Sequence, residues 1–384
     1  MKIAVTTLAF CVAALLALGM VMLFSAGLTE ARTVTQVQAG PHYLLVQMIW
    51  CALGLILCAT ATLVDSRLLK KFVWPLFGLA LILLVCVLLP LPHGITRKIN
   101  GAHRWFVLPG IRLQPSEIGK LALIFALAWY GERTQRQMGT WSRGILLPGL
   151  MIAAMIGLIF IEPDYGTTIL MACVSGSLLL IAGVRWKYFM PPIFLGAVGF
   201  AVAIWQNPLR LKRVLSWLDL ESSKTDVGYQ AYQAMLALGS GGWTGLGLGN
   251  SRQKLGWVPE HHTDFIFSII GEELGLVATL LVVVAFVVIV LCGIYISLRA
   301  PDTFGVLLGC GLTLLIGLQA FINIGVVTSA LPNKGLPLPF ISYGGSNLLA
   351  MFACVGLLFS IARRGRESQR VTNPFAADEL PQPA

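Results

Sequence analysis

Long apolar runs separated by short polar segments fill the chain from end to end. Each run is about 20 residues long, the length at which a helix crosses a bilayer core of about 30 Å. Backbone groups in lipid must be hydrogen-bonded within their own segment, so each run is predicted to be a helix. The ten predicted spans are residues 4–26, 43–64, 72–92, 115–131, 144–161, 165–184, 188–206, 265–297, 304–329 and 344–362. The pattern therefore predicts an all-α polytopic membrane protein.

The composition agrees with this fold class. The chain of 384 residues is 57% hydrophobic and only 11% charged, whereas soluble domains carry about 25% charged residues. The first span follows a lone Lys2 and is longer than the apolar core of a signal peptide, so we expect a retained anchor. Most of the eight cysteines lie inside apolar runs without CxxC spacing, which indicates packing positions.

The loop charges predict the orientation. With the N-terminus in the cytoplasm, every predicted cytoplasmic loop is basic, as the positive-inside rule requires. The net charge of +10 is then a topology signal, and no nucleic-acid partner is expected. Both termini are predicted to be cytoplasmic. The basic residues of these loops are Arg67, Lys70, Lys71, Arg133, Arg136, Arg143, Arg185, Lys187, Arg299, Arg363, Arg364 and Arg366.

Two outer loops break this charge rule. Segments 93–114 and 207–264 both carry cations, which indicates an anionic partner on the outer face. The second, between the seventh and eighth spans, is by far the longest loop. Its stretch "NPLRLKRVLSWLDLE" has the pattern of an amphipathic interfacial helix, and "GYQAYQAMLALGSGG" suggests a second. Residues 1–362 thus form one transmembrane domain, and the polar tail 363–384 is predicted to be disordered in the cytoplasm.

Ionisable residues at the edge of the membrane are functional candidates by default. Glu117 and Lys120 are three apart, hence on one helix face. A structural ion pair and a polar cavity lining are equally good interpretations of this pair. For Glu162 and Asp164 in "IEPDYGTT", a capping and turn role is favoured.

A glycine-dense stretch, "GSGGWTGLGLGNSRQK", invites a phosphate-loop interpretation. It lacks the GxxxxGK[ST] pattern, and no strand–helix unit surrounds it. We therefore expect its glycines to permit tight backbone turns near the membrane.

The stretch "WVPEHHTDFIFSIIGEELG" places several ionisable groups against an apolar run. Asp264 could cap the eighth helix, but capping needs one residue and leaves Glu260, His261 and His262 unexplained. A carboxylate at a water–lipid boundary suits a general base. Adjacent histidines are a weak metal signal, and Glu273 is expected to be a packing or polar-pair position.

Near the end of the chain, "LPNKGLPLPFISYGGSN" (331–347) cannot form a regular helix through residue 340, because it contains three prolines and several glycines. Irregular backbone at membrane depth requires cover by protein or a wet cavity. A re-entrant outer loop facing Asp264 is predicted, and Lys334 would add a cation there.

These motifs together resemble the SEDS family of FtsW and RodA, and "NKGLPLPFISYGGS" is closer to the FtsW branch. The resemblance implies a ten-helix, inverting peptidoglycan glycosyltransferase of the bacterial plasma membrane. It would polymerise lipid II on the outer face and release undecaprenyl pyrophosphate. A class B penicillin-binding protein and other divisome or elongasome membrane proteins are the implied partners.

The resemblance also implies site residues. Asp264 of "HTDF" matches the essential carboxylate and would be catalytic. The residues that would bind substrate are Arg104, Trp105, Glu117, Lys120, His262 and Lys334. "GGSN" in place of the commoner "GGSS" weakens any specific role for Asn347 that the resemblance would imply. The motifs identify no metal ligands and no certain cofactor; a divalent cation, Mg²⁺ or Mn²⁺, at the pyrophosphate is left open.

Both lines of reasoning lead to one mechanistic hypothesis, in which Asp264 removes the proton from an acceptor sugar hydroxyl. A lipid II flippase is the main alternative, and a scaffold that only recruits a penicillin-binding protein is another. A flippase has no need of a base at the outer mouth. Polymerisation of lipid II by the purified protein separates the enzyme from the flippase, and growth supported by the Asp264→Asn variant would indicate the scaffold.

Overall fold

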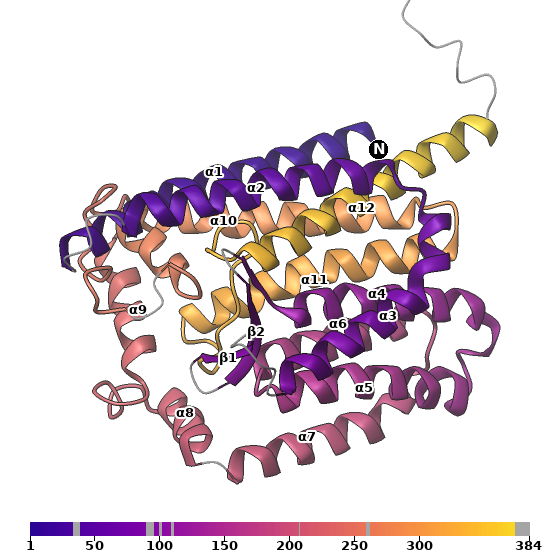
Figure 1. Cartoon of the computed structure of the whole chain (residues 1–384), viewed down its shortest axis with the longest axis horizontal. Helices are drawn as coiled ribbons and strands as arrows, with labels where there is room; N and C mark the ends of the chain where they lie inside the picture. Colours follow the sequence, from indigo (N-terminus) through magenta and orange to yellow (C-terminus); the bar gives the residue numbers. More distant parts are fainter. Residues whose placement is uncertain are drawn as a thin grey trace, which may run out of the picture.

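The computed structural model describes residues 1–33, 39–89, 96–99, 102–108, 111–206, 208–258 and 262–372. Its long helices lie side by side with their axes nearly parallel (Figure 1). The ten that match the predicted spans are α1 (Lys2–Thr33), α2 (Ala39–Leu63), α3 (Ser66–Leu88), α4 (Pro115–Arg133), α5 (Leu147–Ile161), α6 (Tyr165–Ile181), α7 (Met190–Trp205), α10 (Ile266–Leu298), α11 (Thr303–Val327) and α12 (Gly345–Thr372). The chain is an all-α polytopic membrane protein, as predicted.

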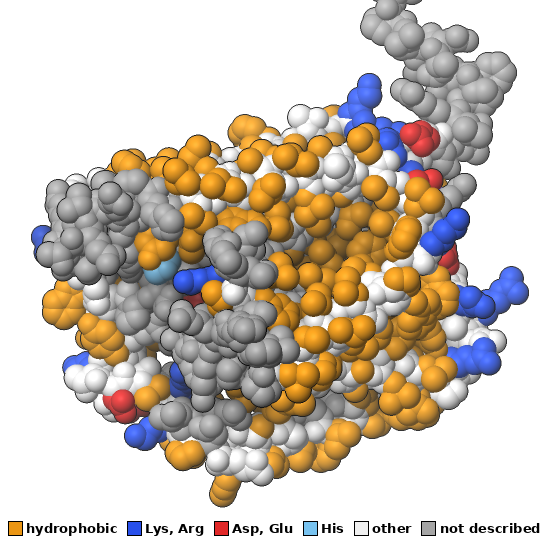
Figure 2. Space-filling model, viewed as in Figure 1, with side chains coloured by type: hydrophobic (Ala, Val, Ile, Leu, Met, Phe, Trp, Pro, Cys, Tyr) orange, Lys and Arg blue, Asp and Glu red, His pale blue; other side chains and the backbone are white. Residues whose placement is uncertain are grey.

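The helices differ in how they meet lipid. Among the described residues, eight helices are long and apolar enough to cross a membrane. The other two matching helices are α6, with 17 residues, and α4, which carries Glu117 and Lys120 in its first turns. Both pack against α11 and one another, so neighbouring helices cover their polar groups. Figure 2 shows the apolar side chains spread over the middle of the bundle, with Lys and Arg gathered near its ends.

One end of the bundle carries the smaller elements, and we call it the sheet end. It holds a three-stranded antiparallel sheet of β1 (Thr96–Ile99), β2 (Ala102–Leu108) and β3 (Ile111–Leu113), which the sequence analysis did not predict. The two helices expected in the long loop are present as α8 (Pro208–Leu218) and α9 (Tyr229–Ser240). The N-terminus lies at the opposite end (Figure 1).

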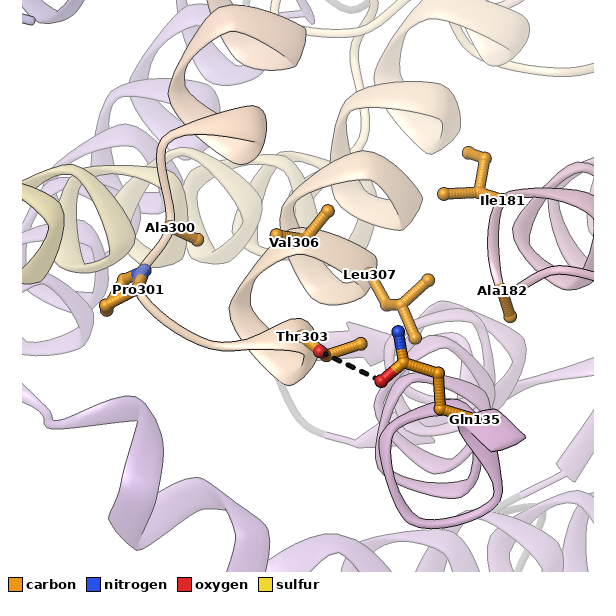
Figure 3. A pocket seen from close by; sticks show the side chains of 8 residues that line it. All are labelled: Gln135, Ile181, Ala182, Ala300, Pro301, Thr303, Val306 and Leu307. Carbon is orange, nitrogen blue, oxygen red and sulfur yellow. Dashed lines mark hydrogen bonds between the residues drawn. The ribbon is translucent and has the colours of Figure 1, made fainter. Parts of the chain in front are cut away.

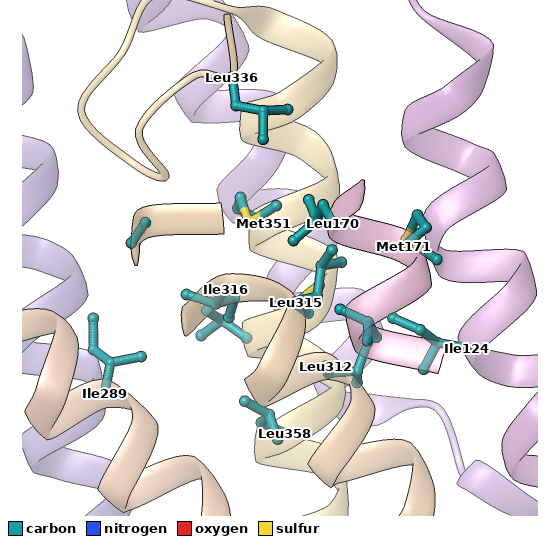
Figure 4. Packing of buried hydrophobic residues seen from close by; sticks show 14 of the residues in the cluster. Ile124, Leu170, Met171, Ile289, Leu312, Leu315, Ile316, Leu336, Met351 and Leu358 are labelled. Atoms are coloured by element: carbon teal, nitrogen blue, oxygen red, sulfur yellow. The ribbon is translucent and has the colours of Figure 1, made fainter. Parts of the chain in front are cut away.

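The core is built around α11, which packs closely on its neighbours because it presents glycines to them. A Cβ on Gly311 would lie 2.6 Å from Ile124 of α4, and one on Gly309 would lie 2.4 Å from Ser297 of α10. In lipid, helices associate by such close packing rather than by hydrophobic burial. Figure 4 shows Leu312, Leu315 and Ile316 of α11 among Met351 and Leu358 of α12, with Leu336 above them.

The long eighth span is broken at Gly275, whose φ of 76° and ψ of −172° interrupt α10. The glycine-rich loop pairs with the backbone groups that the break releases: Leu276 N–H donates to Gly242 O and Leu246 N–H to Glu272 O, both at 2.9 Å. A Cβ on Gly275 would lie 2.4 Å from Gly245 N, so the approach requires glycine. The glycines thus serve tight packing, as expected.

Two carboxylates of α10 hold this loop. Glu273 accepts hydrogen bonds from the backbone N–H groups of Gly249 and Ser251, and Glu272 accepts one from Arg252 N–H. Lys254 pairs with Glu273 at 2.7 Å, and their side chains are 3% and 0% exposed. The loop therefore binds anionic groups of its own chain. The polar-pair interpretation of Glu273 is confirmed.

The C-terminal helix is longer than predicted. α12 continues to Thr372, so the first part of the predicted disordered tail 363–384 is helical, while residues 373–384 lie outside the described part of the chain. Arg363 donates to Leu63 O at 3.0 Å, and Arg364 pairs with Asp302 at 3.5 Å. These contacts fix the first polar turn beyond the apolar run.

Candidate active site

Residues 331–344 form an irregular segment at the sheet end, between α11 and α12; we call it the re-entrant loop. Leu336, Leu338, Phe340 and Ile341 in it are all buried. The loop descends to α1, where a Cβ on Gly19 would lie 2.8 Å from Ile341 Cα. The segment therefore enters the helix bundle, as the prolines and glycines predicted.

Asp264 lies directly against this loop. A Cβ on Gly335 would lie 2.1 Å from Asp264 Oδ2, so the carboxylate rests on the bare Cα of Gly335. Hydrogen bonds fix the segment before α10: Tyr343 N–H donates to His262 O at 3.0 Å, and Ser342 Oγ donates to Thr263 O at 2.6 Å. The predicted facing of Asp264 and the loop is present in the structure.

The ammonium of Lys334 lies against aromatic side chains of α6 and α7. Its Nζ is 4.3 Å from the ring centre of Tyr165 at the start of α6 and 5.6 Å from that of Phe200 in α7. The start of α6 packs on the loop as well, since a Cβ on Gly166 would lie 3.0 Å from Leu336. Lys334 thus lies against α6 and α7, and Asp264 lies against the next residue of the loop, Gly335.

Arg104 lies at the turn that joins α5 and α6. From β2, it donates hydrogen bonds to the backbone carbonyls of Glu162 and Pro163. Asp164 caps α6, accepting from Thr167 N at 3.1 Å, which confirms the capping interpretation for this residue. Trp105, next on β2, is half-buried, and its backbone pairs with Arg97 of β1.

Glu162 does not share the capping role. Its side chain is fully buried, and neither carboxyl oxygen has a hydrogen-bond partner among the described residues. Burial, and to a smaller extent the nearby Asp164, raise the pKa of Glu162 to about 8 against the opposing effect of Arg104. The carboxyl is therefore mostly protonated at pH 7. Sequence reasoning missed this, because a turn carboxylate gives no sign of its burial.

Glu162→Gln is expected to flatten the pH dependence of stability. Between an ordinary pKa of 4.5 and the folded value of about 8, the folded state holds a proton that the unfolded state releases. The free energy of unfolding therefore falls as pH rises through this window, by up to about 1.4 kcal/mol per pH unit. Thermal unfolding in detergent from pH 5 to 9 measures the slope.

The control for this change is Glu221→Gln, since Glu221 is exposed and pairs with Lys224 at the surface. Its slope should match the wild type. Equal slopes for wild type and Glu162→Gln would show that Glu162 is ionised in the folded protein at neutral pH.

The Glu117–Lys120 pair is buried beneath the re-entrant loop. Lys120 Nζ lies 2.8 Å from Glu117 Oε2, and the residues are 0% and 4% exposed. Lys120 also donates to Gln319 at 2.9 Å, and Asn347 donates to Glu117 at 3.2 Å. This geometry is that of a structural ion pair. The same pair thus holds the side chains of Gln319 and Asn347 at its two ends.

His262 stacks on an aromatic side chain from a distant helix. Its ring centre is 5.2 Å from that of Tyr43 in α2, and 6.0 Å from that of Tyr343. The ring thus joins α2, α10 and the re-entrant loop at the sheet end. Glu260 and His261, its predicted companions, lie outside the described residues.

The described residues do not form a resident metal site. No group of three or more His, Cys, Asp or Glu side chains among them could hold a metal ion. A pocket of about 350 Å³ lies between the end of α6 and the start of α11 (Figure 3). Its lining includes no ionisable side chain, and it lies at the end of these helices away from Asp264.

Known proteins match this chain over most of its length. The family model of FtsW, RodA and SpoVE, described as "Cell cycle protein", matches residues 6–367. The "Probable peptidoglycan glycosyltransferase FtsW" of Marinobacter nauticus is 42% identical over 364 residues, covering 93% of this chain and 88% of that protein. Its counterpart in Trichlorobacter lovleyi is 37% identical over 351 residues, covering 91% of each.

Solved structures share the fold. A chain from a structure described as "Structural coordination of polymerization and crosslinking by a peptidoglycan synthase complex" superposes with a TM-score of 0.77 at 29% identity, covering 93% of this chain and 97% of that one. The "Rod shape determining protein RodA" of Thermus thermophilus gives 0.67 at 28% identity, covering 93% and 95%. Sequence and fold together show that this chain belongs to the FtsW/RodA/SpoVE family, the SEDS family that its motifs resemble.

Proposed function

We propose that this chain is a peptidoglycan glycosyltransferase that polymerises lipid II and releases undecaprenyl pyrophosphate. The names of its relatives support the activity. The observation that carries the proposal is the position of Asp264, whose carboxylate rests against Gly335 beside Lys334, where a bundle of apolar helices meets its polar loops. Such a boundary suits a substrate that has a sugar at one end and a polyprenyl chain at the other.

We place the sheet end on the outer face of a bacterial plasma membrane. Basic residues of the predicted cytoplasmic loops lie at the opposite end, such as Lys70 in the first turns of α3 and Arg133 at the end of α4. The positive-inside rule then puts both termini in the cytoplasm.

The reaction needs one proton acceptor. Asp264 takes the proton from the 4-hydroxyl of the acceptor sugar as that oxygen attacks the anomeric carbon of the donor. A new glycosidic C–O bond forms, the bond to the pyrophosphate breaks, and its electron pair leaves with undecaprenyl pyrophosphate. The displacement inverts the anomeric centre, and no covalent enzyme intermediate is formed.

The leaving pyrophosphate requires positive charge near the loop. Lys334 is the cation next in sequence to Gly335, and Arg104 lies at the α5–α6 turn that packs on the same loop through Gly166. Lys120 is fully buried in its ion pair, so we assign it to supporting the loop. Trp105 and His262 offer ring surfaces for the sugars at the same end.

Among the described residues, Asp264 belongs to no group of three or more His, Cys, Asp or Glu side chains that could hold a metal ion. Magnesium in phosphate chemistry is commonly held by one or two carboxylates together with the substrate. An ion carried in by the pyrophosphate would therefore count as part of the substrate, and no step above depends on it.

We further propose a class B penicillin-binding protein as partner, together with other divisome or elongasome membrane proteins. The support is the resemblance of this fold to a chain from a structure described as a peptidoglycan synthase complex. In such a pair, the glycan strand made here would be crosslinked by the transpeptidase.

The test is polymerisation by the purified chain in detergent, alone and with a class B transpeptidase. Lipid II should be converted to a ladder of glycan products with release of undecaprenyl pyrophosphate. Movement of lipid II across proteoliposome membranes without any polymer would instead support a flippase.

Gly335→Ala is expected to lower kcat by about 10²-fold, because the new Cβ displaces the Asp264 carboxylate, and a misplacement of about 1 Å costs that much. Gly344→Ala is the matched control: it lies in the same loop, and its Cβ would meet only ordinary contacts at 4.0 Å. The assay is the initial rate of lipid II polymerisation. Equal rates for the two variants would contradict the placement of Asp264 against Gly335.

A further inference from the structure

Two buried amide side chains of α11 face the re-entrant loop. Gln319 and Asn323 are four residues apart, hence on one face of the helix, and are 0% and 1% exposed. The hydrogen-bond partners of both amides lie outside α11. Both reach other segments of the chain.

Asn323 joins the two segments that form the site, namely the segment before α10 and the re-entrant loop. Its Nδ2 donates to Asp264 O at 2.7 Å and to Leu336 O at 2.6 Å. An amide nitrogen has two hydrogens, and each is used here. One side chain thus fixes the distance between the residue that bears the carboxylate and the residue that follows Gly335.

Gln319 fixes the next peptide of the loop. Its Nε2 donates to Pro337 O at 2.9 Å, while its Oε1 accepts from Lys120 at 2.9 Å. The carbonyls of Leu336 and Pro337 are therefore both held by α11. With two successive carbonyls bound, the loop can neither slide along α11 nor rotate about its own axis without breaking a buried hydrogen bond.

A contribution to the stability of α11 does not explain why the polar side chain of Asn323 is buried in this helix. A buried polar residue in a helix commonly bonds to its own backbone, as Thr313 does when it donates to Gly309 O at 2.8 Å. Asn323 bonds instead to two other segments, and its Oδ1 is buried without a hydrogen-bond partner among the described residues. That oxygen costs stability. The geometry is that of a clamp between Asp264 and the loop.

We propose that Asn323 is a positioning residue of the transferase, setting where the Asp264 carboxylate stands relative to the re-entrant loop. The inference rests on the proposed function, since it assigns Asn323 to the same site. Asn323 touches no reacting atom; it acts through the backbone of Asp264 and Leu336.

Asn323→Leu, which removes both donors, is expected to lower kcat by about 10- to 100-fold with KM for lipid II within twofold of wild type. Asn323→Asp keeps the shape of the side chain but removes its amide group. If Asn323→Leu does not fold, the kcat of Asn323→Asp tests the proposal in its place. Thr313→Val is the matched control on the same helix, expected to keep wild-type rates. Melting temperature and monodisperse elution check the fold of each variant.

A combination with Gly335→Ala separates positioning from a merely structural effect. If both changes act by displacing the same carboxylate, the double variant should lose less than the product of the two single losses. The assignment would be overturned if the kcat losses of the two single variants multiply in the double variant. An unchanged kcat in a folded Asn323 variant, or an effect on KM alone, would also overturn it.

The proposed function and this inference fail in different ways in one experiment. Wild type that makes no polymer contradicts the transferase itself. Active wild type, inactive Asp264→Asn and fully active Asn323→Asp leave the transferase in place and overturn the clamp alone.

Discussion

Asp264→Asn is expected to reduce lipid II polymerisation by at least about 10³-fold, because the amide cannot accept the proton of the acceptor hydroxyl. The change keeps the size and shape of the side chain beside Gly335, so the contact with the re-entrant loop is retained. Initial rates of polymer formation by the purified protein, measured with and without a transpeptidase partner, give the effect.

The control for Asp264→Asn is Asp226→Asn. Asp226 is an exposed carboxylate in the connection between α8 and α9, with a side chain 70% exposed, and its loss should leave the rate unchanged. Growth supported by Asp264→Asn in place of the wild-type gene would favour the scaffold, and full polymerisation by that variant would remove Asp264 from the mechanism.

Glu273→Ala is expected to destabilise the folded protein by about 3–5 kcal/mol, the cost of leaving one member of a buried ion pair without its partner. Lys254 would lose its carboxylate, and the Ser25 hydroxyl of α1 would lose its acceptor at 2.7 Å. The backbone N–H groups of Gly249 and Ser251 would lose theirs as well. Thermal and chemical unfolding in detergent measure the loss.

Two comparisons sharpen this test. Glu367→Ala removes an exposed carboxylate that lies 3.9 Å from Arg363 and should change stability by less than about 1 kcal/mol. Lys254→Met combined with Glu273→Leu removes both charges together and should be more stable than Glu273→Ala alone. If the single and double variants unfold alike, the ion pair does not carry the stability of the loop.

The hydrophobic pattern alone predicted the helices. In lipid, the backbone groups of a long apolar run must be hydrogen-bonded within the run, and a helix achieves this. The sheet was missed because its strands are short, and their residues, such as Arg104 and Trp105, read equally well as an irregular basic loop. The C-terminal boundary was placed too early, since contacts of Arg363 and Arg364 with other segments extend α12.

The candidate site was predictable where a motif carries its own chemistry. The residue types and positions of Asp264, Lys334 and the loop prolines predicted a site at the boundary between water and lipid. Their supports did not: Gln319 and Asn323 lie in an apolar helix, and their partners are set by tertiary packing. The hydrogen bond from Asn347 to Glu117 likewise joins two helices that are far apart in sequence.

The packing order has a consequence for biogenesis. α1 lies against α2 and α10, and α2 against α12, so the first two spans to leave the ribosome find their long-range neighbours only among the last to be made. Until then, the hairpin of α1 and α2 contacts lipid where the later helices will pack. This suits α2, because only 11% of its membrane-spanning residues are buried even in the finished bundle. Ribosomes stalled before α10 should therefore carry a hairpin inserted in the bilayer but not yet docked.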